Sequence, residues 1–185
     1  MLQVPSGFEM IVQLKVQLGQ ARAAYWLSTL FCFQWWLSIF VPLGFIGVWL
    51  KVAKRTMIVE TMVYGLLWAT ASVYLDFAGT SFMLWEYPYT LVPMASKNLS
   101  ANLTSIPISF MLVYQYCRTL KRFFLATVAI SFVFSFMCEP ILVWLGMYKL
   151  YHWMYYYSFF LYVLLSLIFR WITKGLLAMQ SRHCK

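Results

Sequence analysis

Long apolar runs alternate with short basic clusters along most of the chain. No charged residue occurs between Ala23 and Leu50, and this run exceeds the roughly 20 residues that an α-helix needs to cross a bilayer. Further apolar runs of similar length follow it. The pattern predicts spanning helices near residues 23–50, 57–78, 99–117, 123–146 and 150–170.

The first residues follow a different pattern. Glu9, Lys15 and Arg22 precede any long apolar run, and the apolar positions between 8 and 20 fit both a strand and a helix period. Because this stretch is short and precedes a spanning segment, it is predicted to be a helix lying along the membrane surface.

These patterns predict an all-α fold. It is a polytopic transmembrane helical bundle of about five spanning helices with an N-terminal interfacial helix. The predicted domains are an interfacial segment at 1–22, a five-helix transmembrane domain at 23–175 and a basic cytoplasmic tail at 176–185.

The composition agrees with a membrane chain. Of the 185 residues, 63% are apolar and 10% are charged, whereas a soluble domain has roughly 45 to 50% apolar and about 25% charged residues. The net charge of +9 comes from basic clusters between the apolar runs. Membrane topology explains these clusters better than nucleic-acid binding does, so the expected partner is the lipid bilayer and no nucleic acid is expected.

The distribution of lysine and arginine predicts the orientation. With five helices, ten of these residues lie on the side of the 1–2 loop, the 3–4 loop and the C-terminal tail, and four lie on the other side. In membrane proteins, lysine and arginine are enriched in the loops on the cytoplasmic side. The chain is therefore expected to be a cell-membrane protein with its N-terminus outside and its C-terminus in the cytoplasm.

Motifs for catalysis and metal binding are missing from the sequence. The four cysteines form no Cys-x-x-Cys pair and read as small apolar residues. No metal-ligand spacing, nucleophile motif or phosphate loop is found. No metal or cofactor is therefore expected, and the sequence favours a protein that is not an enzyme.

The candidate chemistry centres on Glu139, a carboxylate followed by Pro140 inside an apolar helix. A charge at mid-membrane depth costs about 2.5 to 3.5 kcal/mol or more, so Glu139 needs a partner. With a rise of about 1.5 Å per residue from a cytoplasmic start at Phe123, Glu139 reaches the outer leaflet, and Asp76 reaches a similar level. The candidate ligand-binding residues of an outward-facing polar pocket under the 79–98 loop are Asp76, Trp85, Glu86, Glu139, Tyr148 and Trp153.

A structural interpretation of the same residues stays open. Glu139 can instead accept hydrogen bonds from Tyr, Trp or Ser side chains on neighbouring helices and lock the bundle. At the inner end, Glu60 and Arg170 come to comparable depth and are candidates for a structural ion pair.

Two functions therefore compete. The first is a non-enzymatic integral membrane protein, a structural or assembly subunit with a protein partner or a second copy of itself. The alternative is a binder or transporter of a small lipid-like or cationic ligand that uses Glu139 and Asp76.

A set of motifs is spread over residues 30–172. They are Gln34 to Trp36 with Val41 to Leu43, Arg55 through Glu60 to Gly65, Leu75 and Asp76 with Gly79, Leu84 to Tyr89, Pro107, Met111 to Tyr116, Glu139 and Pro140 with Trp144 to Gly146, Tyr148, Trp153, Tyr157 to Phe159, and Arg170 with Trp171. This set resembles a family of small, uncharacterised multi-pass membrane proteins of Bacillus-type endospore-forming bacteria. The resemblance implies a bacterial membrane location and no established activity. The first 25 residues lie outside it.

Trp85 to Tyr87 form a Trp-x-Tyr stretch, and Ile106 to Ile108 come later in the chain. These residues resemble membrane carotenoid cyclase domains, which carry a Trp-x-Tyr stretch followed by a Pro-Ile-Glu-Glu helix, but Ser109 and Phe110 stand where the two glutamates would be. The resemblance implies an isoprenoid-type enzyme as a further alternative, without the acid pair that carries cyclase chemistry.

Overall fold

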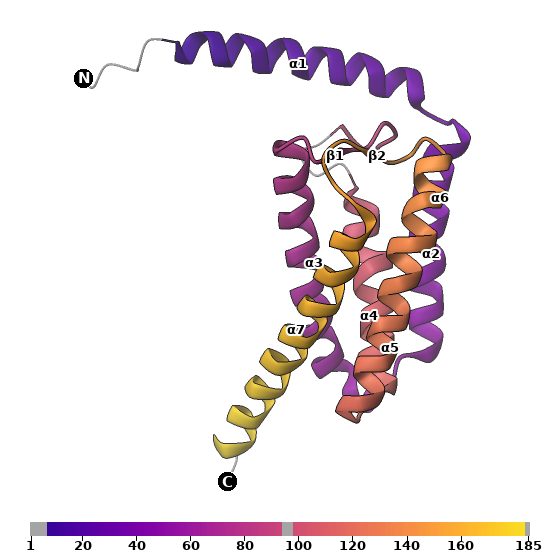
Figure 1. The fold of residues 1–185 in the computed structure, drawn as a ribbon, viewed down its shortest axis with the longest axis vertical. Helices are drawn as coiled ribbons and strands as arrows, with labels where there is room; N and C mark the ends of the chain where they lie inside the picture. Colours follow the sequence, from indigo (N-terminus) through magenta and orange to yellow (C-terminus); the bar gives the residue numbers. More distant parts are fainter. Residues whose placement is uncertain (1–6, 94–97, 184–185) are drawn as a thin grey trace, which may run out of the picture.

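The computed structural model describes residues 7–93 and 98–183. Its helices run side by side as an elongated bundle, and one helix crosses over the end of it (Figure 1). The elements are α1 (Phe8–Thr29), α2 (Phe33–Val52), η1 (Arg55–Met57), α3 (Ile58–Ser81), β1 (Trp85–Glu86), η2 (Ala101–Ser105), α4 (Ile106–Tyr116), α5 (Leu120–Val133), η3 (Phe134–Cys138), α6 (Glu139–Trp144), β2 (Lys149–Leu150) and α7 (Tyr155–His183).

Four helical stretches among the described residues are long and apolar enough to cross a membrane. They are α2, η1 with α3, the continuous run of α5, η3 and α6, and α7 as far as Gln180. Their lengths of 20 to 27 residues match the roughly 30 Å hydrocarbon thickness of a bilayer. The prediction of an all-α fold is thereby confirmed, and the four candidate spans support a membrane protein.

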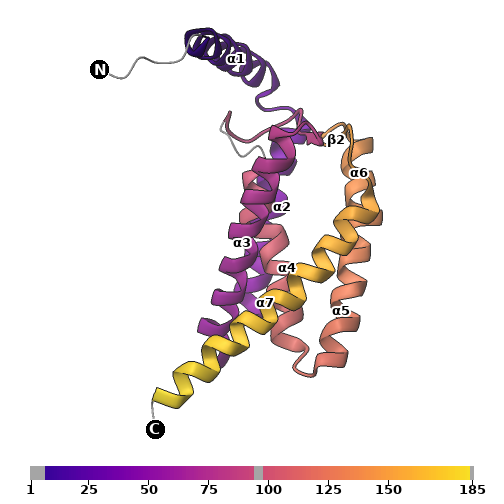
Figure 2. The ribbon, with the colours of Figure 1, turned by 60° about the vertical axis from the view of Figure 1, so that its left-hand side comes forward.

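The fifth predicted span, near 99–117, forms η2 and α4. It is not among the four stretches that are apolar enough to be candidate spans. Helix α4 packs against α2, α3 and α5 in the middle of the bundle (Figure 2). A helix surrounded by protein can carry polar residues that a lipid-facing helix cannot, and here these are the buried Asn102, Ser105, Ser109 and Gln115.

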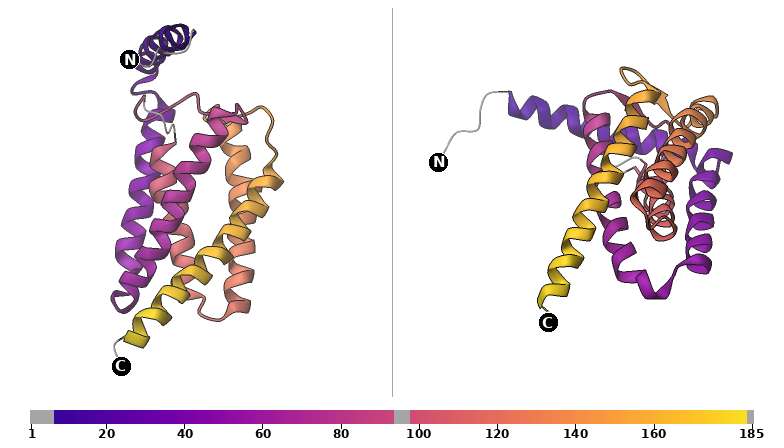
Figure 3. Two further views of the ribbon diagram at one scale, coloured as in Figure 1. Left: turned by 90° about the vertical axis from the view of Figure 1, so that its left-hand side faces the viewer. Right: turned by 60° about the horizontal axis from the view of Figure 1, so that its bottom comes forward.

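The first predicted span, near 23–50, is divided in two. The interfacial helix α1 continues to Thr29, and the chain turns at Leu30 to Cys32, where Phe31 has a left-handed φ of 61°. Helix α1 lies crosswise above the bundle and none of its residues is buried (Figure 3). The predicted N-terminal segment is thus helical and continues past residue 22 to Thr29, and its position along the membrane surface stays a prediction.

The last helix also differs from its prediction near 150–170. It begins at Tyr155 and continues to His183, so the predicted tail at 176–185 is helical as far as the structure describes it. The start is later because Lys149 and Leu150 form β2, which pairs antiparallel with β1. This two-stranded sheet was not predicted. It joins the loop after α3 to the corner before α7 at the end of the bundle that α1 covers (Figure 1).

Two helices widen to π-helical turns just before a proline. Segment η2 ends two residues before Pro107, and η3 ends two residues before Pro140. A proline has no N–H to donate, and its ring collides with the carbonyl oxygen four residues back. A wider turn relieves that collision and leaves helix carbonyl groups without their usual donors.

Candidate functional site

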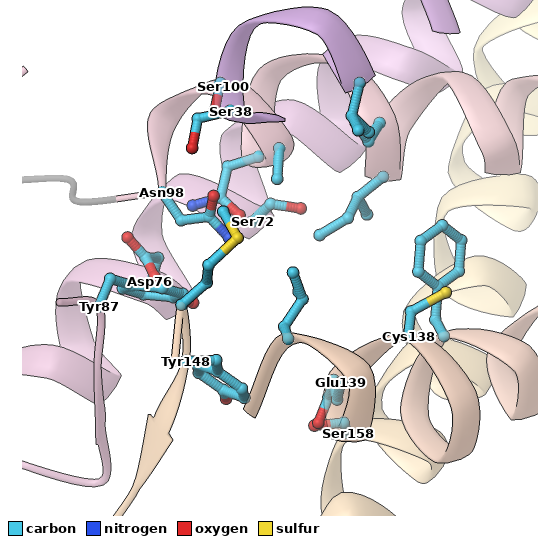
Figure 4. A pocket seen from close by; sticks show the side chains of 18 of the residues that line it. Ser38, Ser72, Asp76, Tyr87, Asn98, Ser100, Cys138, Glu139, Tyr148 and Ser158 are labelled. Atoms are coloured by element: carbon cyan, nitrogen blue, oxygen red, sulfur yellow. The ribbon is translucent and has the colours of Figure 1, made fainter. Parts of the chain in front are cut away.

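A cavity of about 380 Å³ lies inside the half of the bundle that carries the two-stranded sheet. Its wall combines residues of α2, α3, η2, η3, α6 and α7 with the loops around β1 and β2. Most of the lining is apolar, with Leu37, Val41 and Phe45 on α2 as examples. Polar side chains enter it from several helices (Figure 4).

Asp76 forms one polar side of the cavity. It lies on the same buried face of α3 as Ser72 and Gly79, and only 3% of its surface is exposed. The indole N–H of Trp85 donates to Asp76 Oδ1 at 3.5 Å. Tyr87 lies beside Asp76 in Figure 4. Burial, and then the nearby Asp76 carboxylate, raise the pKa of Tyr87 well above its usual value, which keeps this phenol neutral.

Gly79 is the residue that lets Trp85 close over α3. A Cβ atom at position 79 would lie 2.0 Å from the Trp85 ring. Since real Cβ atoms do not approach so closely, only glycine permits this packing. Trp85 in turn packs edge-on against Trp153 with ring centroids 4.9 Å apart, so the loop after α3 is fixed to the start of α7.

Glu139 forms the opposite polar side, at the first residue of α6, with 8% of its surface exposed. Ser158 Oγ donates to Glu139 Oε2 at 3.1 Å, and the Tyr162 hydroxyl donates to Oε1 at 3.4 Å. Trp153 Nε1 donates to Ser158 Oγ at 2.9 Å and completes a short hydrogen-bonded chain. In Figure 4, Glu139 and Ser158 lie together across the cavity from Asp76. Both donors to Glu139 among the described residues are neutral hydroxyls.

Tyr148 comes to the cavity from the turn after α6. Helix α6 ends at Trp144, and Gly146 takes a left-handed φ of 71° that turns the chain towards β2. Tyr148 is buried and stacks on Tyr87 with ring centroids 5.2 Å apart. Burial, together with the Glu139 carboxylate, raises the pKa of Tyr148, so its hydroxyl is a neutral hydrogen-bonding group at the cavity wall.

The structure thus brings five of the six predicted site residues to one cavity. The exception is Glu86, whose position in β1 opposite Lys149 lies outside the cavity lining and whose carboxylate accepts from the Tyr87 N–H. Tyr87, Ser158 and Tyr162 were missed. The spacing of Ser158 and Tyr162, four residues apart on α7, was a usable signal that both face the same neighbour.

The predicted ion pair between Glu60 and Arg170 is wrong. Glu60 accepts a hydrogen bond from the Tyr114 hydroxyl, and Arg170 donates to Cys117 O at 3.1 Å and also to Arg118 O. Arg170 lies over the Phe123 ring, 4.3 Å from its centroid. Cys117 and Arg118 directly follow the end of α4 at Tyr116, where carbonyl groups lack donors from the helix, so the guanidinium binds these oxygens instead of pairing with the acid.

Within residues 7–93 and 98–183, no group of three or more His, Cys, Asp or Glu side chains comes together as a metal site. The chain matches no family model, no curated protein and no solved structure. The cavity and its contacts are therefore the basis on which a function is inferred.

Proposed function

We propose that this membrane protein binds a small lipid-like cation in the cavity, with Asp76 and Glu139 as the groups that recognise it. The observation that carries the proposal is the convergence of two carboxylates from α3 and α6 on opposite sides of one largely apolar cavity. A cavity of this size, mostly apolar with a few convergent polar groups, is typical of small-molecule sites.

The contacts of Glu139 favour a cationic group on the ligand. Its partners are the hydroxyls of Ser158 and Tyr162, which donate hydrogen bonds but supply no positive charge. A buried ionised carboxylate gains most from a positively charged partner, because the attraction between opposite charges is strong in a low-dielectric site. An ammonium group on the ligand would supply that charge.

The surroundings favour a ligand that comes from the bilayer. Pro42 is the buried residue of α2, and the rest of that helix is exposed or half-buried where lipid would surround it. Gln34 Nε2 donates to Leu145 O at 3.4 Å, a long bond between α2 and the end of α6. We infer that the ligand enters between α2 and α6, where both helices line the cavity.

The interrupted helices give further support. Segments η2 and η3 both contribute to the cavity wall, through residues that include Asn102 and Cys138. Broken helices with free backbone groups at a shared site are a recurrent feature of membrane carriers. Transport of the ligand is therefore the natural extension of binding.

A structural or assembly subunit is the second candidate. The hydrogen bonds from Ser158 and Tyr162 to Glu139 are those of a carboxylate that locks helices together. Helix α1 exposes large apolar side chains such as Phe8, Ile11 and Leu14, which a partner could cover. The isoprenoid-type enzyme has weaker support, since Ser109 donates to Ser105 O and Phe110 stacks on Trp68 in the core.

We also propose that the bundle crosses the membrane five times, with α4 as the central span, the N-terminus outside and the C-terminus in the cytoplasm. Single cysteines should be introduced into a background without native cysteines, one at Thr90 and one at Lys54. A membrane-impermeant maleimide is expected to label Thr90→Cys in intact cells, and Lys54→Cys only after permeabilisation. Labelling of both from the same side would contradict the five-span topology.

Binding can be measured with dodecylamine in lipid nanodiscs, using the tryptophan fluorescence of Trp85 and Trp153 beside the site. We expect saturable binding by the wild type and a loss of at least about tenfold in affinity for Glu139→Gln, because the ionic bond is lost. Glu86→Gln is the matched control, since Glu86 lies outside the cavity lining, and it should bind as the wild type does. A non-saturating signal, or equal affinity in Glu139→Gln, would overturn the proposed function.

A further inference from the structure

Two residues of η2 line the cavity, and each carries a buried polar atom that has no hydrogen-bond partner in the described chain. The residues are Asn102 and Ser105, which are 4% and 6% exposed, and the atoms are Asn102 Nδ2 and Ser105 Oγ. A buried polar group without a partner costs about 1 to 3 kcal/mol. Such a group in a native protein usually has a hydrogen-bond partner that is not part of the chain. In a cavity this partner is a ligand or a water molecule.

The neighbouring hydroxyls show that a hydroxyl in this stretch can donate to a backbone carbonyl of its own helix. Thr104 donates to Ser100 O, and Ser109 donates to Ser105 O at 2.7 Å, so both bond to the carbonyl four residues earlier. This is the usual way for a helix hydroxyl to satisfy itself. Ser105 does not use it, although it lies on the same stretch of helix.

Asn102 and Ser105 differ from the other residues with unpartnered hydroxyls in that they line the cavity. Thr127, Ser131, Ser135 and Ser166 also lack partners among the described residues, but they belong to α5, η3 and α7 and are not part of the cavity lining. Asn102 and Ser105 belong to the wall itself. Segment η2 packs against α3, which carries Asp76, so the pair lies on a helix adjoining the acidic side of the cavity.

The chemistry of the pair determines what it can bind. An amide NH₂ is a donor only, and a serine hydroxyl can donate as well as accept. Neither offers charge, so the complementary group is a neutral acceptor such as a carbonyl oxygen. The two carboxylates recognise a different group, because they accept hydrogen bonds.

We propose that Asn102 and Ser105 form a second polar subsite that binds a carbonyl oxygen of the ligand. This inference rests on the proposed function and narrows it. The ligand class is an amphiphile that carries both an ammonium group and an ester or amide carbonyl at the head of an apolar chain. The ammonium binds the carboxylates, and the carbonyl accepts from the Asn102 amide and the Ser105 hydroxyl.

Two probes of equal length isolate the carbonyl. Glycine dodecyl ester carries an amine and a carbonyl, and 2-(dodecyloxy)ethylamine has a CH₂ group in place of that carbonyl. At about pH 6 both amines are protonated, so charge does not differ between the probes. In wild-type nanodiscs we expect the ester to bind about tenfold more tightly than the ether, which corresponds to one or two additional hydrogen bonds.

The near-isosteric variant Asn102→Leu should remove that preference and leave the affinity for the ether unchanged. Ser105→Ala is a milder second variant that should reduce the preference and that keeps the inference testable if Asn102→Leu does not fold. Equal affinity of the two probes for the wild type, or a preference that survives both substitutions, would overturn the subsite. If neither probe binds the wild type, the proposed function fails with it, whereas binding of both probes without preference overturns the subsite alone.

Discussion

Substituting alanine for Gly79 is expected to destabilise the protein by about 2 to 3 kcal/mol, the upper part of the range for overpacking a buried contact. The new Cβ would lie 2.0 Å from the Trp85 ring, so the ring has to leave its place on α3. That movement breaks the hydrogen bond from Trp85 to Asp76 and the contact between Trp85 and Trp153. Thermal unfolding in detergent measures the loss.

Gly47→Ala is the matched control for this substitution. Gly47 lies inside α2, and a Cβ atom there would have no neighbour within 4 Å. Alanine favours a helix more than glycine does, so this variant should be as stable as the wild type or slightly more stable. Equal melting temperatures of the Gly79→Ala and Gly47→Ala variants would show that Trp85 does not close over α3 as described.

Two substitutions of Glu139 should give different results. Glu139→Ala removes the acceptor of Ser158 and Tyr162, leaves both hydroxyl donors without an acceptor inside the bundle and is expected to cost about 2 to 3 kcal/mol. Glu139→Gln keeps an oxygen acceptor and the side-chain length, so its thermal stability should stay close to that of the wild type. The two variants are compared by thermal unfolding in the same detergent.

The charge of Glu139 is thus expected to matter for the ligand and not for the fold. No ion pair with Lys149 is present in the described chain, where the Lys149 ammonium lies 5.2 Å from the centroid of the Tyr151 ring. A Gln variant as unstable as the Ala variant would contradict this assignment, because it would mean that the fold itself needs the negative charge.

The sequence predicted those features of the fold that depend on long apolar runs. Helices α3 and α7 and the run of α5 to α6 were found because a bilayer demands many consecutive apolar residues. The turn at Leu30 to Cys32 was missed, because it contains neither glycine nor proline and lies inside an apolar run. The pairing of β1 with β2 was missed because each strand has two residues, too few for a periodic pattern.

The candidate site was predicted from the depth of its residues in the membrane, as given by their positions along the helices. A constant rise per residue was enough to bring Asp76 and Glu139 to the same level, and the structure shows both at one cavity. Glu60 and Arg170 also lie at similar depth but do not pair, since depth does not fix the direction in which a long side chain points. Arg170 points to the backbone just after α4. Asn102 was not among the predicted site residues, because the absence of a hydrogen-bond partner for its amide among the described residues is visible only in the structure.

The most direct test of the account is a photolabel that reports where a lipid-like cation binds. A dodecylamine with a diazirine in its chain is bound to the protein in nanodiscs, irradiated and mapped by mass spectrometry. We predict labels on the cavity-lining Leu37, Phe45 and Leu161, and a loss of these labels in Glu139→Gln. Labels on the exposed Phe40 and Phe160 of the same helices, unchanged in Glu139→Gln, would show a molecule dissolved in lipid and would contradict a binding cavity.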